Sequence, residues 1–205
     1  MITDQIARQL AQSLTTNGQA SLVVCGGSSP LGIFDALAAG DHEDEVDWSR
    51  VTITLVDDRL VPADHEHSNQ KLLHDNLLRG PVAAANFIRL EANNAAMDIR
   101  RPFDVMLLGM GVDGHFASLF PDMVGEAPLK IDTPPMILET GPKGSPTLPR
   151  VTMNLAMILQ SRLLILLVNG AEKQAVLQAA QSLSLIHISE PTRRRGISYA
   201  VFCLK

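Results

Sequence analysis

A histidine and a carboxylate, both suited to acid–base catalysis, stand two positions apart in a glycine-rich stretch. His115 and Asp113 belong to the run GMGVDGH at residues 109–115, which continues the apolar run FDVMLLG at 103–109. A histidine can take a proton from water near neutral pH, and a neighbouring carboxylate can share its hydrogen-bond network. The pair is therefore a candidate general base. A structural turn that holds a satisfied histidine is the competing interpretation.

The same stretch also spells the dinucleotide-binding fingerprint G-x-G-x-x-G, with Gly109, Gly111 and Gly114 in the glycine positions. That fingerprint needs a helix next, and then a strand that ends in an acid about 20 residues on. Here proline occurs four times between positions 121 and 135. We therefore rank a dinucleotide-binding module as a minor alternative.

A second group of residues is suited to binding phosphate. Gly26, Gly27 and Ser28 lie in the run CGGSSP, where glycines let the backbone approach a ligand and a following helix offers free N–H groups. A tight turn between a strand and a helix explains the same residues, and both interpretations stay open.

Three cations are candidates for holding the same anion. Arg59 follows an apolar β-branched run and can bind phosphate or carboxylate through two hydrogen bonds, although a surface ion pair with Asp57 and Asp58 is the alternative. Arg150 and Lys173 could complete a phosphate site, but each alone is also typical of a solvated cation.

Histidines at positions 65, 67 and 74 raise the possibility of a metal site. The H-x-H pair lies in a polar stretch with acidic neighbours and no nearby cysteine, which is weak evidence for zinc. We expect solvated loop histidines and no metal.

The elements that must position these residues are four short apolar runs alternating with helical patterns. The runs cover residues 21–25, 51–57, 103–109 and 162–168. Strands that are apolar on both faces indicate a parallel sheet covered on both sides. The sequence therefore predicts a doubly wound α/β fold, with the candidate residues at the carboxyl ends of its strands, where such sheets bind ligands.

Composition narrows the function classes further. The 205 residues suffice for one domain, 46% are hydrophobic, and the formal net charge is -5. A mildly acidic chain with 4% aromatic residues has no electrostatic footprint for nucleic acid or anionic lipid. Two cysteines, no signal-peptide pattern and no long apolar stretch predict a cytoplasmic protein with no membrane partner.

Taken in order, the motifs resemble a known family. CGGSSP, DDRLVP followed by SN, GMGVDGHFASLFPD, LPR and NGAEK are similar to those of the 6-phosphogluconolactonases over about residues 2–180, and DGH-x-ASLFP is the most specific block. The resemblance implies a sugar-phosphate isomerase-like fold with a mainly parallel sheet and helices on both faces. It also implies hydrolysis of 6-phospho-D-glucono-1,5-lactone to 6-phospho-D-gluconate in the oxidative pentose phosphate pathway, without metal or organic cofactor.

The resemblance assigns roles by position. His115 would activate water, Asp113 would support it, and Arg59 would hold substrate oxygens and stabilise the oxyanion. The residues that bind the substrate and its phosphate would be Gly26, Gly27, Ser28, Arg59, Arg150 and Lys173. Because the serine-nucleophile motif G-x-S-x-G does not occur, direct attack by water is preferred to an acyl-enzyme.

Glucosamine-6-phosphate deaminase is the nearest alternative. It resembles the same fold and has a G-x-D-G-H block, but that block ends in Asn-Glu-Pro, which supplies a catalytic glutamate. Here the stretch reads Leu119-Phe120-Pro121, so we rank the deaminase below the lactonase. The expected partner is a small phosphosugar lactone, and the expected state is a monomer or weak dimer.

The last 23 residues have a different character. LSLIHISEPTR resembles the translation of a transposase-based sequencing adapter, and ISYAVFCL resembles the flow-cell adapter that follows it in the same frame. We therefore expect a lactonase domain at residues 1–182, an adapter-derived tail at 183–205, and a missing C-terminal strand and helix. A natural amphipathic tail is the alternative, and an inactive fragment with an open sheet edge is a possible consequence.

Overall fold

The computed structural model describes residues 1–92, 98–187 and 200–204. Its helices are α1 (Ile2–Asn17), α2 (Leu31–Ala38), α3 (Asn69–Asn76), α4 (Leu155–Ile158) and α5 (Ala171–His187). Its strands are β1 (Ala20–Val24), β2 (Val51–Leu55), β3 (Asp57–Arg59), β4 (Asn86–Ile88), β5 (Phe103–Gly109), β6 (Ile137–Lys143), β7 (Leu148–Met153), β8 (Ser161–Val168) and β9 (Ala200–Leu204).

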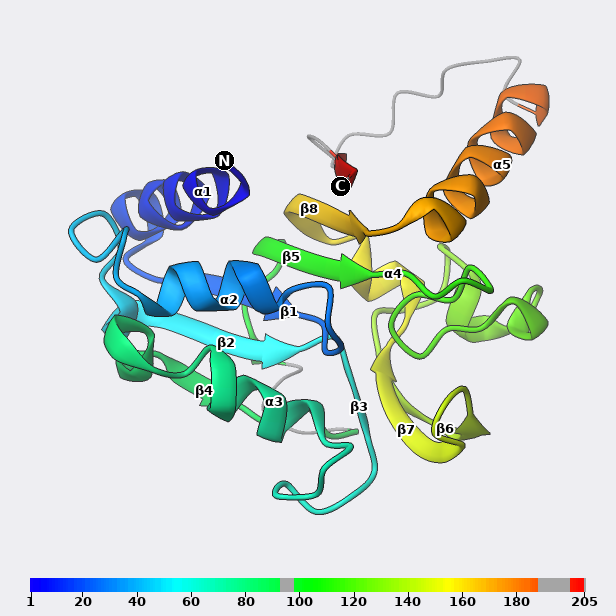
Figure 1. Ribbon diagram of the computed structural model, residues 1–205, viewed down its shortest axis with the longest axis horizontal. Coiled ribbons are helices and arrows are strands. Elements are labelled where there is room, and N and C mark those ends of the chain that lie inside the picture. The colour runs from blue at the N-terminus through cyan, green and yellow to red at the C-terminus, as the bar shows by residue number, and fades with distance from the viewer. Residues whose placement is uncertain (93–97, 188–199, 205) are drawn as a thin grey trace.

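The main sheet has six strands in the order β4-β2-β1-β5-β8-β9, and every neighbouring pair is parallel (Figure 1). The predicted mainly parallel α/β fold is confirmed, because the four apolar runs became β1, β2, β5 and β8. From β1 the chain proceeds to β2 and β4 on one side, whereas β5 and β8 lie on the other. The strand order therefore reverses between β1 and β5, which is where open parallel sheets bind ligands.

The apolar residues of the N-terminal helix recur with helical spacing. Ile6, Leu10 and Leu14 recur every four residues and are buried, because that spacing puts them on one face of α1. This helix packs against β1 and β5 and ends at Gly18, whose φ of 76° is left-handed and favours glycine. All five residues of β1 are buried, as expected for a strand with helices over a parallel sheet.

A second sheet was not predicted. It has three antiparallel strands in the order β3-β7-β6, and β6 and β7 come from a stretch, residues 137–153, where no strand was predicted from the sequence. The chain crosses between the sheets at Val56, whose N–H donates to the carbonyl of Val24 at 2.9 Å and whose carbonyl accepts from Met153 of β7 at 3.0 Å. The polar residues after β2 therefore form a strand of their own.

The C-terminal edge of the main sheet is occupied by a strand from the segment that the sequence assigned to the adapter-derived tail. β9 lies parallel to β8, with Leu164 opposite Ala200 and Val168 opposite Leu204. An unpaired strand edge accepts any extended segment of high β-propensity, and AVFCL is such a segment. The expected boundary at 182 falls inside α5, and residues 188–199 lie outside the described part of the chain.

Candidate active site

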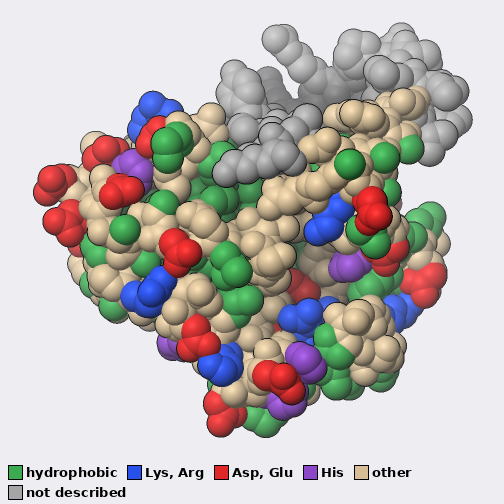
Figure 2. Space-filling view, viewed as in Figure 1, with side chains coloured by type: hydrophobic (Ala, Val, Ile, Leu, Met, Phe, Trp, Pro, Cys, Tyr) green, Lys and Arg blue, Asp and Glu red, His purple; other side chains and the backbone are tan. Residues whose placement is uncertain are grey.

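The carboxyl ends of β1 and β5, together with β3, β7 and the first turn of α5, line one cavity of about 240 Å³. Figure 2 shows basic and histidine side chains around a hollow on the face of the molecule viewed there. The predicted site residues that line the cavity are Gly26, Gly27, Ser28, Arg59, His115, Arg150 and Lys173. Asp113 lies beside the cavity and reaches it through His115. Residues from five separated parts of the sequence thus share one site.

Asp113 and His115 form a close pair. The Nδ1 atom of His115 lies 2.5 Å from Oδ1 of Asp113, and the main-chain N–H of His115 donates to the same oxygen at 3.2 Å. Burial by itself would raise the pKa of Asp113, but the hydrogen bonds from His115 outweigh it and the pKa is lowered. The carboxylate is therefore ionised near neutral pH and suited to accept a hydrogen bond from Nδ1–H. In the neutral imidazole this tautomer leaves Nε2 as the unprotonated ring nitrogen.

The glycine-rich loop and one aromatic ring fix the position of this histidine. A Cβ on Gly111 would lie 2.3 Å from Nδ1 of His115, so a side chain there would displace the ring. On its other side the imidazole stacks on Phe120, with ring centroids 4.7 Å apart and planes inclined by 24°. Gly111 and Phe120 together restrict the imidazole to one packed orientation.

Arg59 is held at the end of β3 by hydrogen bonds from one terminal nitrogen. Its Nη1 donates to Oδ1 of Asn69 at 2.7 Å and to the carbonyl of His67 at 3.2 Å. Its Nε is buried and has no hydrogen-bond partner among the described residues. The guanidinium therefore keeps donors for a bound oxyanion.

The two aspartates before Arg59 have structural partners. Asp58 accepts from the main-chain N–H of Arg59, Asn69 and Gln70, and so anchors the start of α3. Burial raises the pKa of Asp58, although these N–H groups oppose the rise. Asp57 lines the cavity, and burial raises its pKa as well. The surface ion pair considered for this segment is wrong, because both aspartates are buried.

Arg150 lies directly opposite Arg59 in the β3–β7 pairing and is only 3% exposed. Its Nε donates to the carbonyl of Lys143 at 2.8 Å and its Nη2 to that of Pro146 at 3.1 Å, and its guanidinium carbon lies 5.7 Å from the centroid of the Phe120 ring. Burial, and next the charge of Arg59, lower the pKa of Arg150. An anion between the two guanidinium groups would relieve this mutual repulsion.

The first loop and α5 complete the cavity. Gly27 has a left-handed φ of 80°, and α2 begins four residues later at Leu31, so the N-terminal end of a helix faces the same region. Lys173 lies in the first turn of α5. The cavity therefore combines a histidine–carboxylate pair with three cations and a glycine-rich loop, a set that can bind a phosphorylated substrate and remove a proton from water.

The context required for dinucleotide binding is not met. After Gly114 the chain forms isolated bridges between Met110 and Phe116 and between Phe116 and Leu119, whereas the fingerprint needs a helix there. His65 and His67 lie 5.3 Å apart, ring centroid to ring centroid. Within the described ranges no three His, Cys, Asp or Glu side chains gather as a metal site, and no helix is long and apolar enough to cross a membrane.

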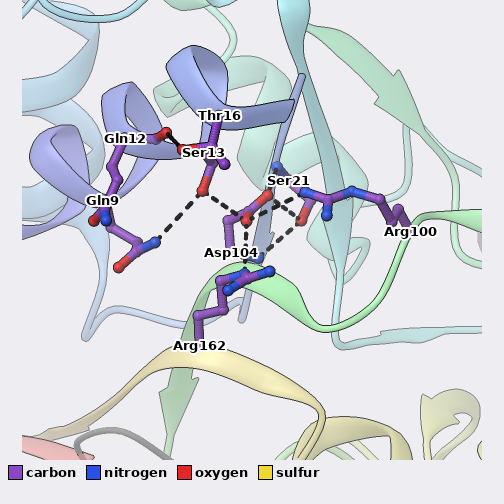
Figure 3. A network of polar contacts seen from close by, with 8 residues as sticks. All are labelled: Gln9, Gln12, Ser13, Thr16, Ser21, Arg100, Asp104 and Arg162. Carbon is purple, nitrogen blue, oxygen red and sulfur yellow. Dashed lines mark hydrogen bonds and ion pairs between the residues drawn. The ribbon is translucent and has the colours of Figure 1, made fainter. Parts of the chain in front are cut away.

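A larger cavity of about 290 Å³ lies at the opposite, amino end of β1 and β5. Asp98 and Asp104 line it. Figure 3 shows that Asp104 already has partners: Oδ1 accepts from Ser13 at 2.7 Å, and Oδ2 accepts from the main-chain N–H of Ser21 at 2.9 Å. Arg100 and Arg162 form ion pairs with the same carboxylate at 3.7 and 3.4 Å. This buried charge is compensated by the fold, and the network joins α1 to the sheet.

Two residues that line the cavity, Asn69 and Asp57, had no functional role assigned from the sequence. Asn69 bridges Arg59 and Asp57, and Asp57 in turn accepts a hydrogen bond from the hydroxyl of Ser118 at 2.7 Å. The SN pair that follows DDRLVP was a visible signal for Asn69. The contact between Asp57 and Ser118 joins residues 61 positions apart, and no local pattern predicts it.

Fold and site together define an α/β protein with a cationic cavity and a histidine–carboxylate pair at the carboxyl edge of a parallel sheet. The model of one family, described as glucosamine-6-phosphate isomerases/6-phosphogluconolactonase, matches residues 1–194. The chain therefore belongs to this family.

Individual relatives agree with this placement. The chain is 35% identical to a 6-phosphogluconolactonase of Rhizobium meliloti (88% of this chain, 82% of the relative) and 38% identical to one of Pseudomonas aeruginosa (86% and 77%). Among solved structures, a 6-phosphogluconolactonase from Shewanella baltica superposes with a TM-score of 0.80 at 31% identity, covering 99% of this chain and 91% of the other. One from Thermotoga maritima has a TM-score of 0.79 at 25% identity, covering 99% and 93%.

Proposed function

We propose that this chain is a carboxylic ester hydrolase that converts 6-phospho-D-glucono-1,5-lactone to 6-phospho-D-gluconate in the oxidative pentose phosphate pathway. The relatives named above carry this activity in their names. The observation that carries the proposal is the hydrogen bond between Asp113 and Nδ1 of His115 beside a cavity with three cations. It leaves one ring nitrogen free to accept a proton from water.

In the proposed mechanism Nε2 of His115 removes a proton from water as the oxygen attacks the lactone carbonyl carbon. Asp113 stabilises the imidazolium that forms, and Arg59 stabilises the oxyanion of the tetrahedral intermediate. The carbon–oxygen ring bond then breaks, and the imidazolium returns its proton to the departing ring oxygen. The products are a carboxylic acid, which ionises in solution, and a hydroxyl group, so one water is consumed and one proton is released.

The phosphate group is proposed to lie among Gly27, Ser28, Arg150 and Lys173, with Gly26 allowing the backbone to approach. These contacts are remote from the bond that breaks. Their binding energy would position the ester carbonyl next to the activated water. Neither step requires a metal or an organic cofactor.

The test is lactone hydrolysis followed by proton release, with the spontaneous rate subtracted. His115→Ala is expected to lose about 10²–10⁴-fold in kcat. His74→Ala is the matched control, because His74 of α3 packs edge-on against Phe87 and does not line the cavity, and it is expected to keep its rate. Equal rates for the unchanged protein and His115→Ala would refute the assignment of the base.

Deamination of glucosamine 6-phosphate is the second candidate, because the family description includes isomerases of that sugar. Its expected acid has no counterpart here, since Leu119 and Phe120 occupy the stretch and are buried. Ammonia release from glucosamine 6-phosphate, in the absence of lactone hydrolysis, would reverse the ranking.

The wider setting is also a proposal. We infer a cytoplasmic monomer or weak dimer without nucleic-acid or membrane partners, supported by the net charge of -5. We further propose that residues 1–182 form the catalytic domain and that residues 183–205 derive from adapter sequence. If the chain as written hydrolyses no lactone while a version extended with a relative's C-terminus does, the given chain is an inactive fragment.

A further inference from the structure

Asn69, the first residue of α3, lies at the meeting point of three parts of the site. It is 3% exposed and lines the cavity. Its carboxamide oxygen accepts from Nη1 of Arg59 at 2.7 Å, and its amide nitrogen donates to the carbonyl of Asp57 at 2.9 Å. Its main-chain N–H, which any residue would supply, donates to Asp58 at 2.6 Å.

These contacts allow only one orientation of the carboxamide. Rotating it by 180° would place an NH₂ group against the guanidinium of Arg59 and an oxygen against the carbonyl of Asp57, so both hydrogen bonds would become repulsive contacts. Because a buried polar group without a partner is costly, the side chain of Asn69 is locked. A locked acceptor in turn fixes the guanidinium that donates to it.

The same carboxamide also lies against the first loop. A Cβ on Gly26 would stand 1.9 Å from Oδ1 and 2.2 Å from Cγ of Asn69. The loop that follows β1 can therefore approach α3 closely only because position 26 is a glycine. This contact sets the position of the glycine-rich loop relative to Arg59.

Arg59 uses the two hydrogens of Nη1 on Asn69 and on the carbonyl of His67. Its Nε is buried without a partner among the described residues. Nε and Nη2 lie on one edge of the guanidinium, and such an edge can bind an oxyanion through two parallel hydrogen bonds.

We propose that Asn69 is a positioning residue, which turns the Nε–Nη2 edge of Arg59 toward the substrate oxyanion and holds the Gly26 loop in register with it. This inference rests on the proposed lactone hydrolysis. It adds a specific requirement: Asn69 acts through Arg59 and touches no substrate atom.

The first test compares Asn69→Ala with Asn76→Ala, the same substitution in the last turn of the same helix, where the side chain donates only to the carbonyl of Leu72. Asn69→Ala is expected to lower kcat/KM about tenfold or more, the size of one lost charge-assisted hydrogen bond. Asn76→Ala is expected to stay within about twofold. An unchanged kcat/KM in folded Asn69→Ala would overturn the proposal.

The second test is a double-mutant cycle with Arg59→Ala. If Asn69 acts through Arg59, adding Asn69→Ala to Arg59→Ala costs little further activity, whereas independent roles multiply the two losses. Multiplied losses would therefore refute the positioning role. If the alanine variant does not fold, Asn69→Asp replaces it in the test. The near-isosteric carboxylate would pair with Arg59 and neutralise its charge, so KM is expected to rise. An unchanged KM would count against the proposal.

A readout independent of hydrolysis separates this proposal from the proposed function. Inorganic phosphate at millimolar concentration is expected to raise the unfolding temperature of the unchanged protein and of Asn76→Ala, and to raise that of Asn69→Ala less, because the loop that Asn69 holds at Gly26 is part of the proposed phosphate site. If no variant hydrolyses lactone and this pattern holds, lactone hydrolysis fails and the positioning role stands. If lactone is hydrolysed and Asn69→Ala keeps both its phosphate shift and its rate, only the positioning role fails.

Discussion

Replacing Asp113 by asparagine tests the histidine–carboxylate pair by removing a charge while keeping the shape. In Asp113→Asn the carboxamide oxygen could still accept from the ring and main-chain N–H of His115, the two bonds that Asp113 accepts at 2.5 and 3.2 Å. What is lost is the negative charge that stabilises the imidazolium as it forms. The effect therefore falls on kcat rather than on substrate binding.

The magnitude follows from the exposure of the carboxylate. A hydrogen bond to a charged group contributes about 1.5–3 kcal/mol where water is excluded, but the side chain of Asp113 is 53% exposed. Water and salt screen the charge, so the lower end of that range applies. About 1.4 kcal/mol corresponds to a tenfold loss in rate, well short of the roughly 10²–10⁴-fold expected when the base itself is removed.

The assay is proton release from the lactone, with kcat and KM measured separately. Asp122→Asn is the control, because Asp122 pairs with Lys143 at 2.5 Å and makes no bond to the histidine. The reasoning predicts the order unchanged protein, Asp113→Asn, His115→Ala, with about tenfold and then at least about a hundredfold loss. A loss in Asp113→Asn as large as in His115→Ala would refute it, as would no loss at all.

Arg150→Met and Lys173→Met are each expected to raise KM about tenfold with kcat largely kept, because the proposed phosphate contacts supply binding energy away from the reacting bond. Steady-state kinetics on the lactone measures both constants, and a fall in kcat alone would contradict the expectation. Burial raises the pKa of Asp57 above its unfolded value of about 3.9. The protonated side chain therefore contributes stability that is fully present below about pH 3.9 and is lost as the pH rises through the folded-state pKa. Between pH 4 and 8, the free energy of unfolding measured with urea should therefore fall less for Asp57→Asn than for the unchanged protein. Parallel falls in the two proteins would count against a costly buried carboxylate at position 57. Amplification of the gene from source DNA is expected to diverge from the given sequence after residue 182, whereas a read that continues as LSLIHISEPTR would show that residues 183–205 are native.

Much of the main sheet was predictable because its signals are local. Apolar runs such as residues 103–109 indicate burial on both faces, and each run is followed within two positions by a glycine or a charged residue that marks the carboxyl edge of the sheet. Ligands bind at that edge in parallel sheets, so candidate residues from separate runs could be placed in one cavity. Arg59 and His115 line that cavity although 56 positions separate them (115 − 59 = 56).

The second sheet was not predictable in the same way. Its strand β3 has only three residues, two of them buried aspartates, and three charged residues give no alternation of apolar and polar side chains from which to recognise a strand. The burial of Asp57 depends on Ser118 and that of Asp58 on the N-terminal N–H groups of α3. Such partners come from tertiary structure, which is why the sequence left a surface ion pair open as an alternative for these aspartates.

The two sheets must stay aligned for the site to work, because the histidine comes from a loop of one and both arginines come from the other. Ser118 makes that alignment: its hydroxyl donates to Asp57 of β3 at 2.7 Å and its main-chain N–H donates to the hydroxyl of Thr152 in β7 at 3.3 Å. Because Ser118 is only three residues from His115, these bonds attach the histidine loop to the strands that carry the guanidinium groups. A buried aspartate is costly to the fold when it is ionised. In the proposed mechanism, the contact between Asp57 and Ser118 holds the proposed base and the cations in register, so stability lost at Asp57 would be part of what keeps these groups facing one another.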